Sequence, residues 1–246
     1  MSRSAGLVSQ WGSVAPEFLV GPELLDAVSL SGERGGMVLG CGPREEPLSI
    51  AMLRPQPSRL VLVGGLYLAR QLALRAMATG AWVVVATGRP SAWQPLTRSA
   101  RAAGEDPEDP EGSRPALIQV HELAPLELPR ASEDTPLLVV HDGGAVPQEL
   151  FPPRTPWQTT LYVLPYLHPQ AEGTAGTAEL VLLQRLPQAQ AELAALIWRL
   201  SPAMTRELVT LADDAVVALG PNLWRPLRLV TTPAEREILG PVRRGD

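Results

Sequence analysis

Runs of apolar residues alternate with polar or proline-rich stretches along this chain and predict an alternating order of strands and helices. The clearest unit spans residues 59–93. An apolar run at 60–63, a Gly-Gly turn, a helix with an apolar stripe at 66–79 and a second apolar run at 82–86 follow one another there. Strands that are apolar throughout are typical of parallel strands covered on both faces. The pattern therefore predicts a βαβ unit with both strands in one sheet and the helix across it.

Shorter runs of the same kind predict the remaining elements. Two apolar runs around a proline-bounded polar loop indicate a β-hairpin at 37–53, before the βαβ unit. Four more strands are expected at 116–121, 137–141, 159–164 and 178–185. After them we expect a helix pair at 188–200 and 202–219, an edge strand at 227–230 and a last helix capped at Thr232.

Together these elements predict a three-layer α/β domain with a mainly parallel central sheet, an N-terminal β-hairpin and a C-terminal helix pair. Residues 1–25 are expected to form a loose lead-in, and residues 26–246 a single domain. The segment 99–115 is acidic, rich in Pro and Gly and almost without large apolar side chains. It is predicted to be a flexible surface loop.

The composition excludes several classes of function. The net charge of −5 supplies no basic field for nucleic acid, and Cys41, the only cysteine of the chain, cannot form an internal disulfide. All 21 basic residues are arginine, so the lysine of a phosphate-binding P-loop is missing. No uncharged apolar run reaches the length of a membrane helix, and a cytoplasmic location is expected.

The chemistry that usually accompanies a βαβ unit is absent from its first loop. Gly64 and Gly65 allow a tight turn, but no G-x-G-x-x-G pattern follows them. We therefore expect no catalytic residue, no cofactor and no metal site. The His-Asp-Gly-Gly sequence at 141–144 is interpreted as a turn, and Asp213 and Asp214 as a solvated helix face. If a ligand does bind, the carboxyl edge of the sheet is the candidate, with Gly64, Gly65, Thr87, Gly88, Arg89, His141 and Asp142.

Tryptophan is unusually frequent for a chain with so little phenylalanine. The chain has six tryptophans and two phenylalanines, and several tryptophans stand beside Pro or Arg in connecting segments. Tryptophan and arginine dominate the residues that contribute most to protein–protein binding. Trp93, Trp157 and Trp224 are therefore candidate interface residues.

Several segments together resemble the soluble domain of the EccE family, a component of the actinobacterial type VII (ESX) secretion machinery. The resemblance covers residues 30–240 and is carried by patterned segments: the hairpin MVLGCGPREEPLSIAMLRPQPSR, the unit LVLVGGLYLARQLALRAMATGAWVVVATGRPSAW, the strand AELVLLQRL with the helix pair after it, and TPAEREILGP. It implies a glycosyltransferase-like α/β fold without evident catalytic residues, at the inner face of the cell membrane. The implied partners are the membrane components and the secretion ATPase of the type VII core. Family members begin with two membrane helices, so membrane association is expected to be indirect or through a segment absent from this chain.

The resulting functional hypothesis is a non-catalytic structural subunit of a secretion complex that acts through protein contacts. The alternative is a nucleotide- or nucleotide-sugar-binding transferase that uses the edge near Gly64, Thr87, Arg89 and His141, with Arg89 in place of a lysine at the phosphate. A third hypothesis is a soluble regulatory module with a small-molecule effector.

Overall fold

A computed structural model describes residues 36–104, 115–147 and 155–242, all of which belong to one unit, Gly32–Asp246. The predicted lead-in at 1–25 lies outside the described residues. The strands are β1 (Met37–Cys41), β2 (Pro47–Ile50), β3 (Ser58–Val63), β4 (Trp82–Thr87), β5 (Ile118–His121), β6 (Leu137–Asp142), β7 (Gln158–Leu164), β8 (Leu180–Leu183), β9 (Ala215–Gly220) and β10 (Leu223–Leu229). The helices are α2 (Leu66–Ala78), α3 (Gln94–Gly104), α4 (Glu172–Gly176), α5 (Gln188–Trp198), α6 (Pro202–Thr210) and α7 (Pro233–Leu239), with 3₁₀ turns η1 (Pro90–Trp93) and η3 (Pro169–Ala171).

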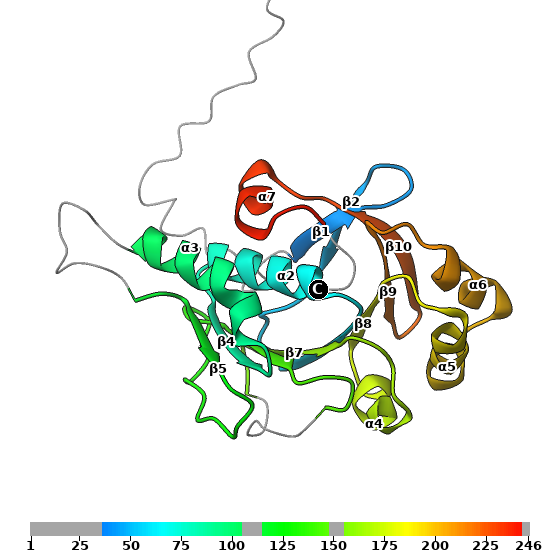
Figure 1. Cartoon of the computed structure of the whole chain (residues 1–246), viewed down its shortest axis with the longest axis horizontal. Coiled ribbons are helices and arrows are strands. Elements are labelled where there is room, and N and C mark those ends of the chain that lie inside the picture. The colour runs from blue at the N-terminus through cyan, green and yellow to red at the C-terminus, as the bar shows by residue number, and fades with distance from the viewer. Residues whose placement is uncertain (1–35, 105–114, 148–154, 243–246) are drawn as a thin grey trace, which may run out of the picture. The chain divides into compact units, whose positions relative to one another are not determined.

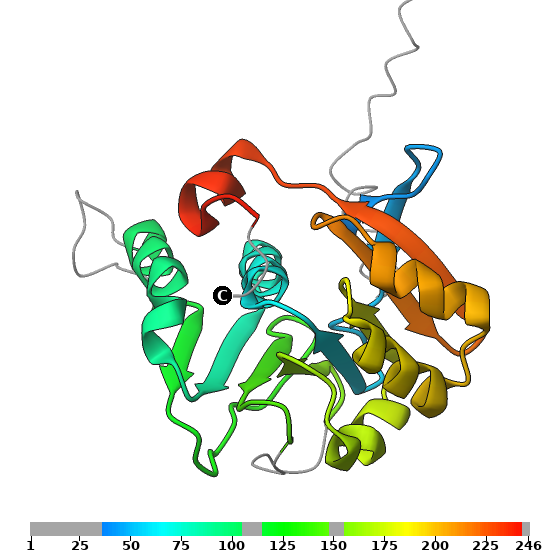
Figure 2. The same cartoon turned by 45° about the vertical axis from the view of Figure 1, so that its right-hand side comes forward.

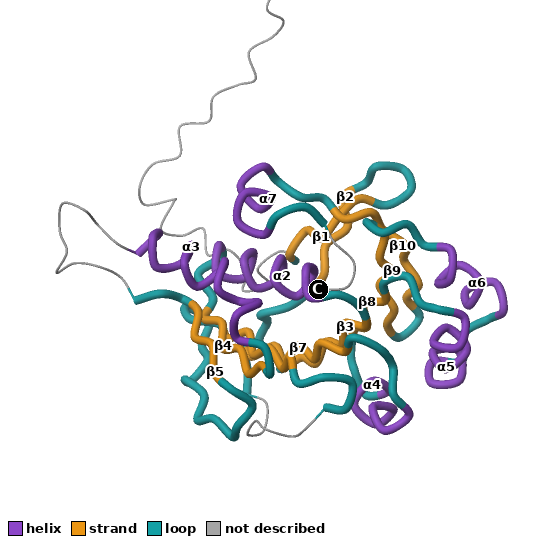
Figure 3. Tube along the Cα trace, viewed as in Figure 1, coloured by secondary structure: helices purple, strands orange, loops and turns teal. Residues whose placement is uncertain are grey.

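All the described strands form one sheet in the order β2-β1-β10-β9-β8-β3-β7-β6-β4-β5 (Figures 1 and 3). The part from β8 to β5 is parallel throughout. The pairings from β2 to β8 are antiparallel. The prediction of an α/β fold with a mainly parallel sheet is confirmed.

Helices lie on both faces of this sheet (Figure 2). Alternation along the strands divides the core between the two faces, as the pleat requires. In β3, Leu60 and Leu62 pack in one cluster with residues of α2, α3 and α7, while Val61 and Val63 pack in another with residues of η3, α5 and α6. On the second face of β4 and β6, Val84 and Val139 are covered by apolar side chains of the connector before β6, among them Leu126 and Leu128. The sheet is thus the middle of three layers.

The βαβ unit, the hairpin and the last helix form as predicted. Helix α2 packs on the sheet, and its buried residues include Leu68, Leu72 and Ala76. It ends at Ala78 with Thr79 as its C-cap, and Gly80 adopts φ +85°, which glycine tolerates best. Helix α7 begins with a capping box in which the side chains of Thr232 and Glu235 each accept a hydrogen bond from the other's backbone amide.

The second helix of the C-terminal pair is shorter than predicted. Helix α6 ends at Thr210, and Ala215–Gly220 is strand β9, which pairs with both β8 and β10. A short apolar run fits helix and strand periods equally, and the two neighbouring strands decide between them. Asp213 and Asp214 therefore lie in the turn before β9, not on a helix face. The strand expected at 227–230 is present as the last part of β10, but its expected place at the edge of the sheet is wrong, because β10 has a neighbour on each side.

The predicted acidic loop at 99–115 begins later than expected. Helix α3 continues to Gly104, so residues 99–104 are helical, and 105–114 lie outside the described residues. The stretch 99–104 contains alanine at 100, 102 and 103, and alanine is the strongest helix former. Among the described residues no helix combines the length and apolar character that crossing a membrane requires.

Candidate functional site

The carboxyl edge of the parallel sheet brings together Thr87 at the end of β4 and Asp142 at the end of β6. The two residues are paired in register on adjacent strands, and Thr87 Oγ1 donates a hydrogen bond of 2.7 Å to Asp142 Oδ2. Thr87 lies two positions after Val85, and Asp142 two positions after Val140, and both valines pack in the cluster that contains α2. Side chains two positions apart on a strand point to the same face of the sheet. Their side chains are therefore directed to the face that α2 and α3 cover.

Two residues from the segment after β4 complete the surroundings of Asp142. Arg89 donates through Nη2 to Oδ1 at 3.0 Å and through Nε to both carboxylate oxygens, at 3.2 and 3.1 Å. Trp93 Nε1 donates to Oδ2 at 3.1 Å. The Asp142 side chain is only 2% exposed, whereas that of Arg89 is 35% exposed. Since the Gly88 amide also donates to the Asp142 carbonyl, the whole turn after β4 is held against the end of β6.

This cluster of Thr87, Arg89, Trp93 and Asp142 is here named the Asp142 cluster. Both oxygens of its carboxylate already accept hydrogen bonds from the chain's own side chains, an arrangement that suits a structural anchor more than a proton acceptor. The expectation that Trp93 contributes to a binding surface is wrong, since Trp93 is completely buried. An indole that closes a buried polar cluster cannot contact a partner from this position.

His141 does not join the Asp142 cluster, although it precedes Asp142 in sequence. Adjacent strand residues point to opposite faces, and the His141 ring lies 5.4 Å from the Tyr162 ring on the second face of the sheet. Burial lowers the pKa of His141, although its backbone hydrogen bond and the Asp142 charge act to raise it. The predicted edge is therefore two separate environments, one on each face.

The Gly64–Gly65 turn lies at the end of β3, where an anion-binding loop is found in many α/β proteins. Here the side chain of Gln184, which follows β8, occupies the turn. Its Oε1 accepts a hydrogen bond of 2.6 Å from the Gly65 amide, just before α2. A Cβ on Gly64 would lie 2.0 Å from the same oxygen. The glycine is thus explained by the close approach of Gln184, and the Gly65 amide, which could donate to a phosphate oxygen, already donates to an amide oxygen of the chain itself.

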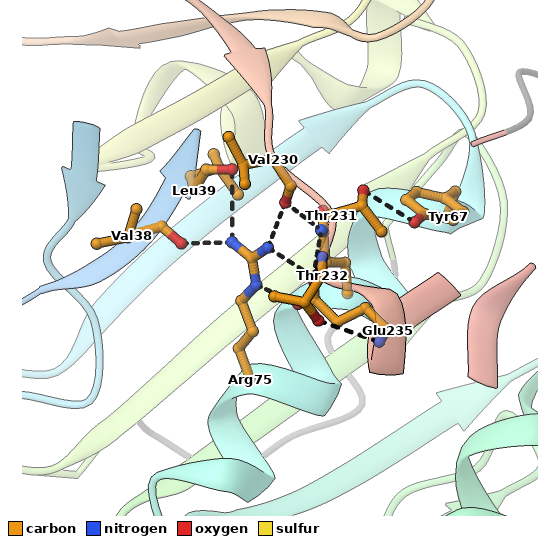
Figure 4. A network of polar contacts seen from close by, with 9 residues as sticks. Val38, Leu39, Tyr67, Arg75, Val230, Thr231, Thr232 and Glu235 are labelled. Carbon is orange, nitrogen blue, oxygen red and sulfur yellow. Dashed lines mark hydrogen bonds and ion pairs between the residues drawn. The ribbon is translucent and has the colours of Figure 1, made fainter. Parts of the chain in front are cut away.

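A second polar cluster, which sequence reasoning missed, surrounds Arg75 on α2 (Figure 4). Arg75 Nε donates to Glu235 Oε1 at 2.5 Å, and its Nη2 donates to Glu235 Oε2 at 3.0 Å and to the Val230 carbonyl at 2.5 Å. Its Nη1 donates to the carbonyls of Val38 and Leu39. One guanidinium therefore joins β1, the end of β10 and α7 to α2. The capping box was visible in the sequence, but the partner of Glu235 was not, because it lies 160 positions away.

Burial by itself raises the pKa of Glu235. Hydrogen bonds from Arg75, the Thr232 backbone and Gln71, together with the Arg75 charge, outweigh that effect and hold the pKa below its usual value. The carboxylate is therefore stabilised in its charged form, as a structural ion pair requires.

The other candidate interface residues remain partly accessible. Trp157 and Trp224 are both half-buried, and Trp224 Nε1 donates to Glu207 Oε2 at 3.0 Å. On α5, Leu196 stands only three positions after Leu193, yet Leu196 is 79% exposed. Leu193 instead packs at the margin of the core beneath α5 and α6. Within the part of the chain that the structure describes, no three His, Cys, Asp or Glu side chains are grouped to hold a metal ion.

Fold and site together define an α/β domain whose carboxyl edge is occupied by its own side chains. The chain is similar in structure to VirB4 of Thermoanaerobacter pseudethanolicus, with a TM-score of 0.54 and 10% sequence identity over 82% of this chain and 98% of that one. At that identity the likeness concerns the fold alone. No family model matches the sequence, and no curated protein does.

Proposed function

We propose that this chain is a non-catalytic structural subunit of a type VII secretion complex that acts through protein contacts on the cytosolic side of the membrane. The sequence resemblance to the EccE family motivates the assignment, and the glycosyltransferase-like label belongs to the same proposal. The proposed partners are the membrane components and the secretion ATPase of that complex.

The observation that carries the proposal is the closure of the carboxyl edge by the chain itself. In open α/β sheets this edge is where ligands bind. Here Gln184 occupies the turn before α2, and the Asp142 carboxylate is engaged by Thr87, Arg89 and Trp93. Residues that satisfy one another in this way support the framework of a domain, so the function is assigned to its outer surface.

Leu196 is the side chain best suited to test that surface. It is a large aliphatic group, 79% exposed, so its replacement costs little in folding. Trp157 and Trp224 remain proposed contacts, but both are half-buried, and their truncation would also disturb packing.

The decisive experiment is co-purification of the tagged chain with the type VII core subunits. We expect the wild-type chain to capture them and Leu196→Asp to capture much less. Ala102→Asp, which adds the same charge at an exposed position of α3, is the matched control and should behave as wild type. A stable chain that captures none of these subunits would contradict the proposal.

The transferase alternative requires that nucleotides displace the contacts at the carboxyl edge. A thermal-shift panel of nucleotides and nucleotide sugars at millimolar concentration distinguishes the two functions. Under the proposed function the melting temperature does not change. A saturable increase that Arg89→Gln removes would favour the transferase.

A further inference from the structure

A pocket of about 300 Å³ opens at the opposite edge of the sheet from the Asp142 cluster, where β3 and β8 begin. Its walls are mostly aliphatic and come from five strands: Leu48, Ile50, Leu60, Leu180, Ala218 and Leu227. Alternation along β10 places Arg225 on the same face as Leu227, so a guanidinium joins the aliphatic wall. The volume is at the lower limit for small-ligand sites.

Two arginines and one glutamate supply the charge of this pocket. Arg54 is half-buried, and its Nε is inaccessible to solvent and makes no hydrogen bond to any residue that the structure describes. Arg225 is exposed, and neither arginine forms an ion pair within the described ranges. Glu179 also lines the pocket, and its Oε2 accepts a hydrogen bond of 2.6 Å from the Arg59 amide. The pocket therefore combines an aliphatic wall with one carboxylate and two guanidinium groups, and neither guanidinium forms an ion pair within the described ranges.

We propose that this pocket binds a carboxylate carried on an aliphatic group. The two guanidinium groups carry more positive charge than the single carboxylate of Glu179 offsets, so the pocket favours an anion. Arginine suits the task because its donors match the two carboxylate oxygens. The aliphatic part of the ligand would cover Leu60, Leu180 and Leu227. The proposed site does not depend on the proposed secretion role, because all its lining residues belong to this chain and binding is measured with the chain alone.

Two sources share this chemistry, namely the C-terminal residue of a polypeptide and a free fatty acid. Titration calorimetry on the full chain, with an acetylated pentapeptide ending in leucine and with octanoate as probes, distinguishes them. Saturable binding of either probe supports the site and names its source. Peptide amide and octanamide are the uncharged controls and should bind at least tenfold more weakly.

Arg54→Gln and Arg225→Gln should each weaken binding about tenfold or more, because each removes a charge-assisted hydrogen bond. Arg98→Gln, at an exposed position of α3 that does not line the pocket, is the matched control. Since Arg225 is exposed, its variant keeps the test valid even if Arg54→Gln fails to fold. The proposal is overturned if neither probe binds at 10 mM, if amides bind as well as acids, or if both pocket variants bind as wild type.

Discussion

Replacing Asp142 by asparagine is the sharpest test of whether the Asp142 cluster is structural. The substitution keeps the size of the side chain but removes its charge and places an NH₂ group where an oxygen accepted hydrogen bonds. Thr87 Oγ1 and Trp93 Nε1 both donate to Oδ2, while Arg89 donates to both oxygens. Asparagine cannot accept all of these bonds, so at least one of these donors loses its partner.

The magnitude follows from the burial of the partners. An unsatisfied buried donor costs about 1–3 kcal/mol, and removing one member of a buried ion pair costs about 3–5 kcal/mol. Arg89 is 35% exposed and regains water, so the ion-pair figure must be reduced. We expect Asp142→Asn to lower the free energy of unfolding by about 3 kcal/mol, which corresponds to a fall of roughly 6–12 °C in melting temperature for a domain of this size.

Urea unfolding followed by circular dichroism measures this loss, with unchanged m-values as the check that both proteins unfold in the same way. Thr87→Val is the graded control, since it removes the hydrogen bond to Asp142 and the acceptor of the Arg89 amide while leaving the charge of Asp142 in place, and it should cost about 1–2 kcal/mol. If Asp142→Asn is as stable as wild type, or more stable, the structural interpretation is wrong. A gain in stability on substitution is typical of active-site residues, which are kept for activity at a cost in stability.

Three further predictions test the other clusters. Gly64→Ala should destabilise the chain by about 2 kcal/mol or more by collision with Gln184, and the Gln184→Ala background should restore much of the loss, as a double-mutant cycle would measure. The pKa of Glu235 is lowered from 4.5, so the ionised carboxylate stabilises the folded chain above that pH. This contribution to the free energy of unfolding is lost as the pH falls through the folded pKa. Arg75→Met should make the free energy of unfolding in urea less dependent on acid pH. The pKa of His141 is also lowered, but for a histidine a lowered pKa means that the folded state favours the neutral form over the charged form. Stability should therefore decline as the pH falls below 6.5, and His141→Phe should remove that decline while Asp213→Asn, at an exposed turn, should not.

Local patterns determined much of this protein without any tertiary information. The apolar runs of β3, β4, β6 and β7 and the Gly-Gly turn before α2 specified the α/β class, because parallel strands buried on both faces require such runs. The capping box specified the start of α7, since its hydrogen bonds lie within four residues. The absence of lysine excluded P-loop chemistry by composition alone, because no other residue supplies the ammonium group of that loop.

Contacts between distant segments were decided only by the tertiary structure. Period-two alternation separates His141 from Asp142, but only the pairing of β6 with β4 and β7 shows what each side chain meets. The partners Arg75 and Glu235, like Gly65 and Gln184, are more than a hundred positions apart. Nothing in a local pattern specifies which distant residue fills a turn or neutralises a charge, because that choice depends on how the strands are ordered in the sheet. For the same reason the local pattern did not decide the structure of β9: its short apolar run fits a helix and a strand equally, and its place between β8 and β10 made it a strand.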